Sequence, residues 1–220
     1  MSINMERVAE LTEIESRRLN ERTKGFGDMY NRARNSLSGG VASSYQLREP
    51  WPIYLERGQG PKVWDVDGNE MWDFHNGFGS MLQGHAHPVI GEAIQERYGK
   101  GTHFAAPTED ALAVAENLSS RWGLPKWRYT NSGSESTMDA IRIARAYTGR
   151  DTVMKIFGSY HGHHDTVMVS IGVEYDKIGD RDNLASLPYG GGMPDATVQM
   201  TVPVPFNDAE CMERRIIRLT

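Results

Sequence analysis

The stretch of residues 126–157 constrains the fold more than any other part of the sequence. Its residue pattern predicts a strand over 126–130, a polar turn over 131–135, a helix over 136–147 and a second strand over 152–157. A helix between two strands returns the chain to the same end of the sheet, so the two strands are expected to be parallel. The sequence therefore predicts an α/β fold with a mainly parallel sheet.

The rest of the chain divides into shorter elements. Three short runs rich in aromatic and β-branched residues lie within 53–74, and the Asp67-Gly68 pair between two of them predicts a three-stranded meander. Residues 24–50 have a weak apolar pattern and several glycines, which predict irregular chain. The remaining predicted elements are helices over 4–22, 88–98 and 109–122, a long loop over 179–195, a strand from 202 and a helix from 208. Because the last helix meets the final residue without a stop signal, we expect this chain to be the front portion of a longer protein.

Composition narrows the class of protein. The 220 residues are 39% hydrophobic and 24% charged, with a net charge of -5, and no run of about 18 apolar residues occurs. A mildly acidic chain with interspersed charges has no electrostatic footprint for nucleic acid. The single cysteine, Cys211, cannot close a disulfide within the chain. We therefore expect a cytoplasmic protein that binds neither nucleic acid nor a membrane.

The turn Asn131-Ser132-Gly133-Ser134-Glu135-Ser136 lies between the first predicted strand and the helix that follows it. Free amide groups, hydroxyls and the positive end of a helix dipole at such a turn favour binding of a phosphate. The same residues are also typical of an ordinary capped helix with a tight turn. Both interpretations stay open on this motif alone.

A second polar segment, Gly158-Ser159-Tyr160-His161-Gly162-His163-His164-Asp165, follows the next predicted strand. It is expected at the same carboxyl-terminal edge of the sheet as the turn, where open α/β sheets bind ligands. An aromatic ring beside a phosphate site suggests a planar phosphorylated ligand. The alternative is a metal site built from the three histidines and the aspartate, which neighbouring residues in one loop seldom form.

Five motifs occur in the order and approximate spacing of a known family. They are Asp65-Val66-Asp67-Gly68, Gly84-His85-Ala86-His87-Pro88, Ala106-Pro107-Thr108-Glu109, Asn131 to Glu135 with Ala140 to Arg145, and Tyr160-His161-Gly162-His163. With them the chain resembles the class III pyridoxal-phosphate-dependent aminotransferases, most of all the branch that includes glutamate-1-semialdehyde aminomutase. The resemblance implies fold type I, truncated at the carboxyl terminus. Residues 1–74, the helix and meander, would belong to the small domain and residues 75–220 to the first part of the large cofactor-binding domain.

The resemblance also implies a cofactor site for pyridoxal 5'-phosphate. Ser132, Gly133 and Ser134 would hold its phosphate, Tyr160 would stack on its ring and His161 would support the loop. The substrates would be an amino donor and a keto acid acceptor, and the active sites would be shared in a homodimer. The family's Schiff-base lysine and the aspartate that pairs with the ring nitrogen both lie beyond the matched region, so the chain is expected to contain no catalytic residue, and a polypeptide that ends at Thr220 would be inactive.

Two departures from the family pattern concern the substrate pocket. Where the aminomutase pattern has an arginine for the substrate carboxylate, this chain has Gln46, which cannot form a bidentate ion pair. Phe78 replaces the tryptophan of the family's Ser-Trp-Gly, and Arg48 is near enough in sequence to replace the lost arginine. These changes favour an aminotransferase that acts on another amino acid, a β-amino acid among the candidates, or on an amine. The alternatives are an aminomutase-like isomerase and a non-catalytic relative that retains the fold.

Overall fold

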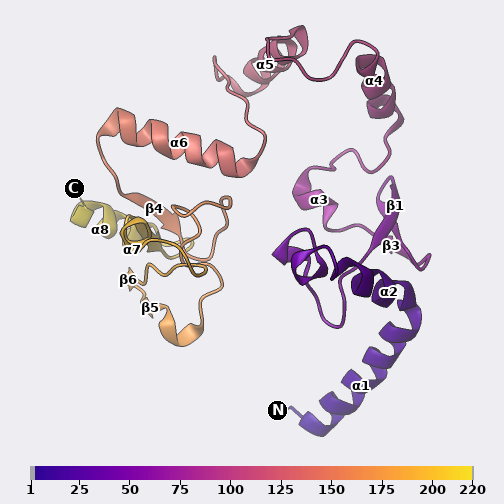
Figure 1. The fold of residues 1–220 in the computed structure, drawn as a ribbon. Helices are drawn as coiled ribbons and strands as arrows, with labels where there is room; N and C mark the ends of the chain where they lie inside the picture. Colours follow the sequence, from indigo (N-terminus) through magenta and orange to yellow (C-terminus); the bar gives the residue numbers. More distant parts are fainter. Residues whose placement is uncertain (1–2, 220) are drawn as a thin grey trace. The chain divides into compact units, whose positions relative to one another are not determined.

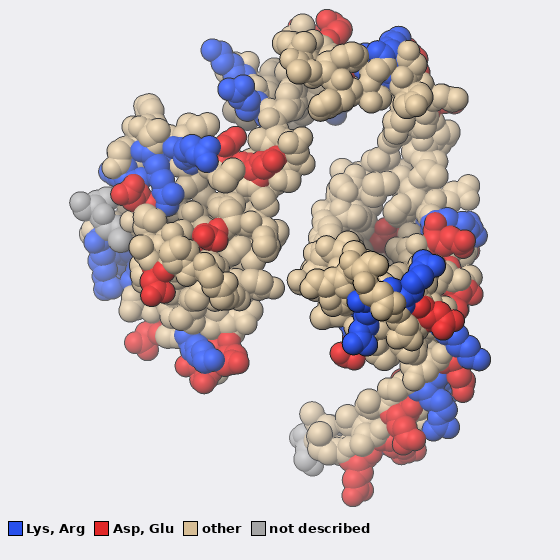
Figure 2. Space-filling model, viewed as in Figure 1, with Lys and Arg blue, Asp and Glu red and all other residues tan. Residues whose placement is uncertain are grey.

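The computed structural model describes residues 3–219 and divides into two compact units, Met1–Pro107 and Thr108–Thr220 (Figure 1). Each unit has its own secondary structure. Within the described residues, no helix combines the length and apolarity that crossing a membrane requires. On the face shown in Figure 2, acidic and basic side chains lie side by side along the first helix.

Unit 1 begins with two helices. The first, α1 (Met5–Arg22), starts at Asn4, whose side chain accepts a hydrogen bond from the Arg7 amide at 3.0 Å. The second, α2 (Lys24–Ala33), lies in the region for which irregular chain was predicted, so this prediction was wrong for its first ten residues. Two one-turn 3₁₀ helices follow, η1 (Ser38–Gly40) and η2 (Ser44–Gln46).

The glycines of α2 explain why the prediction failed. The Gly25 amide donates to the Asp67 carboxylate at 2.8 Å, and a side chain at this position would come within 2.9 Å of the same group. Gly27 faces the Trp51 ring, which would lie 3.3 Å from an added Cβ atom. These glycines therefore allow α2 to approach its neighbours closely, although glycine disfavours an isolated helix.

The predicted three-stranded meander is confirmed. Strands β1 (Leu55–Gln59), β2 (Lys62–Asp65) and β3 (Glu70–Trp72) pair antiparallel in chain order, with a register irregularity near the start of β1. The buried Asp65 carboxylate closes the second turn by accepting hydrogen bonds from the amides of Asp67 and Asn69. Unit 1 continues with a one-turn segment α3 (Asn76–Gly79) and the predicted helix α4 (Pro88–Tyr98).

Unit 2 contains the predicted parallel pair of strands, but with a different partner. Strand β4 (Val153–Ile156) pairs parallel with β7 (Thr201–Val204), and Val204 is fully buried. Residues 126–130 have no regular secondary structure and pair with no described strand, so the predicted strand there was wrong. A strand forms only where a neighbour accepts its backbone hydrogen bonds, which sequence periodicity does not reveal.

The remaining elements of unit 2 surround this pair. They are α5 (Glu109–Trp122), α6 (Gly133–Thr148), η3 (Tyr175–Lys177), β5 (Gly179–Asp180), β6 (Asn183–Leu184), α7 (Asp195–Gln199) and α8 (Ala209–Leu219). Helices α5 and α6 end at glycines with positive φ. The predicted long loop over 179–195 contains the short antiparallel hairpin β5–β6.

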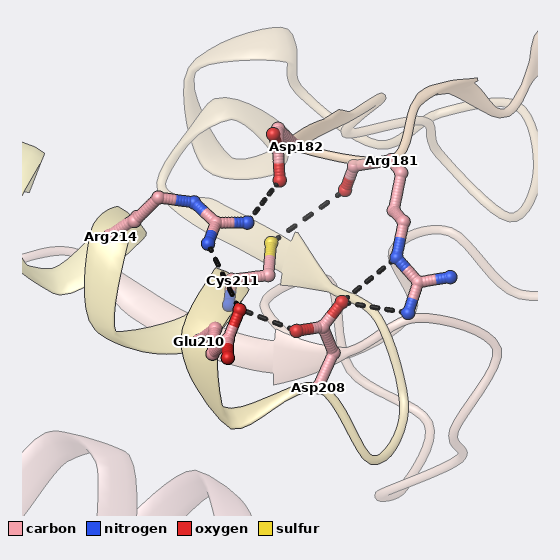
Figure 3. A network of polar contacts seen from close by, with 6 residues as sticks. All are labelled: Arg181, Asp182, Asp208, Glu210, Cys211 and Arg214. Atoms are coloured by element: carbon pink, nitrogen blue, oxygen red, sulfur yellow. Dashed lines mark hydrogen bonds and ion pairs between the residues drawn. The ribbon is translucent and has the colours of Figure 1, made fainter.

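A polar network holds the turn of this hairpin against the start of α8 (Figure 3). The Arg181 guanidinium bonds the Asp208 carboxylate at 2.8 Å, while Asp208 also accepts from the Cys211 amide at the helix start. Arg214, one turn further along α8, donates to Asp182 at 2.6 Å. The Cys211 amide and then Arg181 lower the pKa of Asp208, and Arg214 lowers the pKa of Asp182. Both carboxylates are therefore charged at neutral pH and fix the hairpin to α8.

Candidate functional site

The start of α6 presents groups that are suited to bind an anion. The Ser132 hydroxyl caps the helix by accepting from the Glu135 amide at 3.2 Å, and the Glu135 carboxylate accepts from the Asn131 amide at 2.6 Å. Among the described residues, no acceptor bonds the amides of Gly133 and Ser134, the first two of the helix. Two free N–H groups at the positive end of a 16-residue helix are suited to a phosphate.

The loop after β4 docks on this helix start. The Ser134 hydroxyl accepts a hydrogen bond from the His163 amide at 2.7 Å, which leaves the hydroxyl proton of Ser134 able to donate to a ligand. Gly162 has a φ of +117°, and a Cβ atom there would lie 2.6 Å from the Ser134 Cα atom. The backbone of the loop can therefore reach the helix only with glycine at this position.

Thr137 makes the second connection between helix and loop. Its hydroxyl lies 2.7 Å from the carbonyl oxygen of His161 and 3.1 Å from Nε2 of His164. The sequence analysis did not single out Thr137. It stands four residues after Gly133 and three after Ser134, and this helical spacing would have placed it on the same face.

The loop leaves one aromatic ring exposed beside the docked backbone. Tyr160 is 62% exposed, and its neighbour His161 is held by a 2.9 Å contact between its Nε2 atom and the Ser159 hydroxyl. Burial lowers the pKa of His164, whereas Asp165 raises it by a smaller amount, so the His164 ring is neutral at pH 7. The Thr137 hydroxyl donates its one proton to the His161 carbonyl oxygen, so a neutral His164 ring protonated at Nε2 can donate to the Thr137 oxygen, which supports the docked position of the loop.

The histidines of this loop thus make separate contacts. His161 bonds Ser159, and His164 bonds Thr137. Among residues 3–219, no group of three or more His, Cys, Asp or Glu side chains is arranged to hold a metal ion. The geometry of the loop therefore favours support of an anion-binding helix start.

The two residues predicted for the substrate pocket lie in unit 1. The Gln46 side chain accepts from the Ser43 amide at 3.2 Å and caps η2. Its neighbour Tyr45 contacts Phe78, with ring centroids 5.0 Å apart. The structure thus brings the two predicted segments together, through Tyr45. The side-chain oxygen of Gln46 itself is used in the cap of η2.

Phe78 stands in a strained turn. All four residues of α3 have positive φ, including Asn76 at +51° and Phe78 at +58°, so α3 is a left-handed turn. Phe78 is 75% exposed, and its ring lies 4.3 Å from that of His75, which also contacts Tyr45. Strain at a bulky exposed side chain is typical of functional positions.

Arg48, which the sequence analysis placed as a replacement for the family arginine, also bonds residues close to it in the chain. Arg48 donates to the carbonyl oxygens of Tyr45 and Leu47 at 2.8 and 2.6 Å, and its guanidinium lies 5.3 Å from the Tyr45 ring centroid. These contacts hold it against η2.

A comparison with known protein families identifies the chain. The family model described as "Aminotransferase class-III" matches residues 44–215. The chain is 38% identical over 192 residues to the glutamate-1-semialdehyde 2,1-aminomutase of Methanopyrus kandleri, covering 87% of this chain and 43% of that protein. The corresponding protein of Methanothermobacter thermautotrophicus is 40% identical over 190 residues, covering 86% of this chain and 43% of that protein. The chain thus spans less than half the length of these relatives.

Solved structures show the same relationship. An omega-transaminase from Sphaerobacter thermophilus is 41% identical, with a TM-score of 0.83 over 88% of this chain and 44% of that chain. A glutamate-1-semialdehyde aminomutase from Pseudomonas aeruginosa is 28% identical, with a TM-score of 0.83 over 99% of this chain and 47% of that chain. The predicted α/β architecture of the fold type I transferases is confirmed by these likenesses. The chain belongs to the class III aminotransferase family.

Proposed function

We propose that the protein containing this chain is a pyridoxal-phosphate-dependent transaminase that moves an amino group between an amino acid or amine and a keto acid. The observation that carries the proposal is the docking of the Tyr160 loop on the Ser134 hydroxyl, beside the free amides of Gly133 and Ser134. It combines an anion site with an exposed aromatic ring, as the phosphate and the planar ring of this cofactor require. Similar structures include a transaminase with PLP bound, 38% identical to this chain, and an aminomutase in complex with PMP.

In this proposal each residue of the site has a role. The amides of Gly133 and Ser134 and the Ser134 hydroxyl hold the phosphate, and Ser132 fixes the helix start by capping it. Tyr160 lies against the ring, and His161 holds the loop through Ser159. The bound cofactor supplies the electron sink for amino-group transfer.

We propose that the lysine to which the cofactor attaches is absent from this chain. Lys155 donates to two backbone carbonyl groups, and Lys177 forms a 2.5 Å ion pair with Glu174. Both amines have structural partners, so neither is suited to attack a cofactor.

The proposed substrates are an amino donor, with β-amino acids and amines among the candidates, and a keto acid acceptor. In the absence of the family arginine, Gln46 cannot bind a carboxylate as a bidentate partner, which favours a transaminase over an aminomutase. Phe78, with its exposed ring, forms a wall of the substrate pocket. We further propose a cytoplasmic homodimer with shared active sites, in which residues 1–74 belong to the small domain and 75–220 to the large one.

Borohydride reduction tests the proposed function. The protein expressed from its complete reading frame is expected to keep one cofactor per chain after reduction and denaturation, measured by intact mass. Peptide mapping is expected to place the adduct outside residues 1–220. Absence of any adduct, together with failure to bind pyridoxal phosphate, would contradict the proposal. An adduct on Lys155 or Lys177 would overturn the assignment of the lysine alone.

A second candidate function is supported by the names of the curated relatives, which are glutamate-1-semialdehyde 2,1-aminomutases. An aminomutase isomerises this substrate with no second amino acceptor. Incubation of the complete protein with glutamate-1-semialdehyde separates the two functions: isomerisation without a keto acid would favour the aminomutase, and transfer that depends on an added keto acid would favour the transaminase.

Ser134→Ala is expected to weaken cofactor binding. The substitution removes the hydroxyl that accepts a hydrogen bond from the His163 amide and that would donate one to the phosphate. The Kd for pyridoxal phosphate is therefore expected to rise about 10- to 100-fold. Equilibrium titration of the cofactor absorbance measures the change. Thr148→Ala, which removes a hydroxyl at the other end of α6, is the control and is expected to leave the Kd within about twofold. Equal values for both variants would remove Ser134 from the site.

A further inference from the structure

Lys155 is a buried lysine that the proposed reaction does not use. It lies in the middle of β4, opposite Pro203 of β7, and only 5% of its surface is exposed. Its ammonium group donates to the carbonyl oxygen of Ile156 at 3.2 Å and to that of Val169 at 3.0 Å. Among the described residues, no carboxylate forms an ion pair with it.

These two carbonyl groups mark the ends of the loop that carries Tyr160 and His161. Ile156 is the last residue of β4, and Val169, on the far side of the loop, forms an isolated antiparallel bridge with Pro188. The Gly158 amide donates to the carbonyl oxygen of Ser170 at 2.9 Å, beside the Lys155 contacts. The ammonium group therefore joins the base of the loop on both sides.

The returning end of the loop is itself strained and rigid. Ser170 is fully buried and has a φ of +54°, which is uncommon for residues other than glycine. Its amide donates a hydrogen bond to the carbonyl oxygen of Leu187 at 2.7 Å, and its hydroxyl donates one to the carbonyl oxygen of Ala185 at 2.6 Å. Strained backbone persists where neighbouring contacts fix it, and Lys155 supplies such a contact to the adjacent Val169.

A buried ammonium group without a carboxylate destabilises a fold more than an apolar side chain of the same size would. Burial lowers the pKa of Lys155, which reflects this penalty. Methionine would fill the same space without this penalty. It would leave the Val169 carbonyl oxygen without the donor that Lys155 supplies, whereas the Ile156 carbonyl oxygen would still accept from the Ser159 hydroxyl at 2.6 Å. What the amine contributes at this position is therefore its hydrogen bonds to the loop base.

We propose that Lys155 is a positioning residue for the cofactor site: its amine joins Ile156 to Val169 and so fixes the loop that places Tyr160 and docks on Ser134. The inference rests on the proposed function for the identity of the ligand. The part that concerns the loop base stands on the contacts of Lys155 alone.

Lys155→Met tests the proposal in the complete protein, with Lys177→Met as the matched control because Lys177 is an exposed lysine paired only with Glu174. Hydrogen exchange of the Gly158 amide, measured without cofactor by mass spectrometry, is expected to become about tenfold faster in Lys155→Met and to stay unchanged in Lys177→Met. Pyridoxal phosphate is expected to dissociate about tenfold faster, and the circular dichroism of its visible band is expected to weaken.

A purely structural role would lower the unfolding midpoint of Lys155→Met without changing Gly158 exchange or the dichroism of the bound cofactor, and this result would overturn the proposal. Where Lys155→Met does not fold, Lys155→Gln, which keeps a neutral donor, is the second variant. We expect its Gly158 exchange to be about threefold faster than in the wild type, and exchange equal to the wild type would again overturn the proposal. Failure of the wild-type protein to bind pyridoxal phosphate would refute the proposed function, while the exchange measurement would still decide the role of Lys155.

Discussion

Replacing Gly162 with alanine is expected to separate the Tyr160 loop from the start of α6 and to abolish tight cofactor binding. The new Cβ atom would lie 2.6 Å from the Ser134 Cα atom, closer than non-bonded carbon atoms approach, and the φ of +117° is unfavourable for alanine. Because the clash is with backbone, the loop has to move, and the hydrogen bond from the His163 amide to Ser134 is lost. We expect a loss of about 3 to 5 kcal/mol in the free energy of unfolding and a rise of more than about 100-fold in the Kd for pyridoxal phosphate.

Gly158→Ala is the matched control for this prediction. Gly158 lies in the same loop with a φ of +76°, but no atom lies within 4 Å of the position that its Cβ would take. Its substitution is expected to cost only the backbone strain, about 1 to 2 kcal/mol. Urea unfolding and cofactor titration of both variants measure the difference. If Gly162→Ala behaved like Gly158→Ala, the close approach of loop and helix would not exist in solution.

Replacing Asp73 with alanine is expected to destabilise unit 1 by about 2 to 4 kcal/mol, because one carboxylate there satisfies three donors. Asp73 lies 2.7 Å from Nε2 of His85 and accepts from the amides of His75 and Asn76, both at 2.9 Å. These amides begin the left-handed turn that exposes Phe78. We therefore expect urea unfolding of Asp73→Ala to occur at a lower midpoint, and binding of substrate-like inhibitors to weaken in parallel.

The pH dependence of stability provides a second measure of Asp73. The hydrogen bond from His85, followed by that from the Asn76 amide, lowers the pKa of Asp73 below its ordinary value of 3.8. The unfolded chain then binds the proton more readily than the folded one, so the stabilisation is complete above about pH 4 and is lost as the pH falls through the lower folded pKa. In Asp73→Ala, the part of the acid-induced decrease in the free energy of unfolding that comes from protonation of Asp73 is expected to disappear.

Glu70→Ala is the control for Asp73→Ala. Glu70 forms a 2.6 Å ion pair with Lys62 on the exposed face of the meander, and removal of such a pair is expected to cost less than about 1 kcal/mol. A comparable loss of stability in both variants would show that Asp73 contributes no more than a surface carboxylate.

Much of the geometry of the proposed cofactor site could be predicted from the sequence because its signals are local. A cap residue, a glycine and hydroxyl groups at the start of a helix occupy consecutive positions, and Ser132 caps α6 as this pattern indicates. The place of the second loop followed from its position after a strand. Thr137 was missed because its hydroxyl matters only through contact with His161, 24 residues away in the chain.

The conformation of the predicted substrate-pocket residues was harder to predict, because it depends on contacts with residues that are distant in the sequence. Phe78 was recognised as a departure from the family pattern, but its left-handed backbone depends on Asp73, and Asp73 depends in turn on His85, 12 residues further along. Gln46 was predicted to lie in the substrate pocket, and the cap that its side chain forms on η2 could not be read from the sequence. Side chains of this kind have several possible partners, and periodicity does not choose among them.

The sequence by itself determined the helices that start and stop at residues with strong local preferences, the meander around Asp67-Gly68, and the family. Tertiary structure alone decided that the glycines of α2 lie inside a helix, that residues 126–130 pair with no described strand, and that β4 pairs with β7. The physical reason is the range of the interactions. Caps and turns use partners within a few residues, whereas strand pairing and close backbone approach depend on groups that only folding brings together.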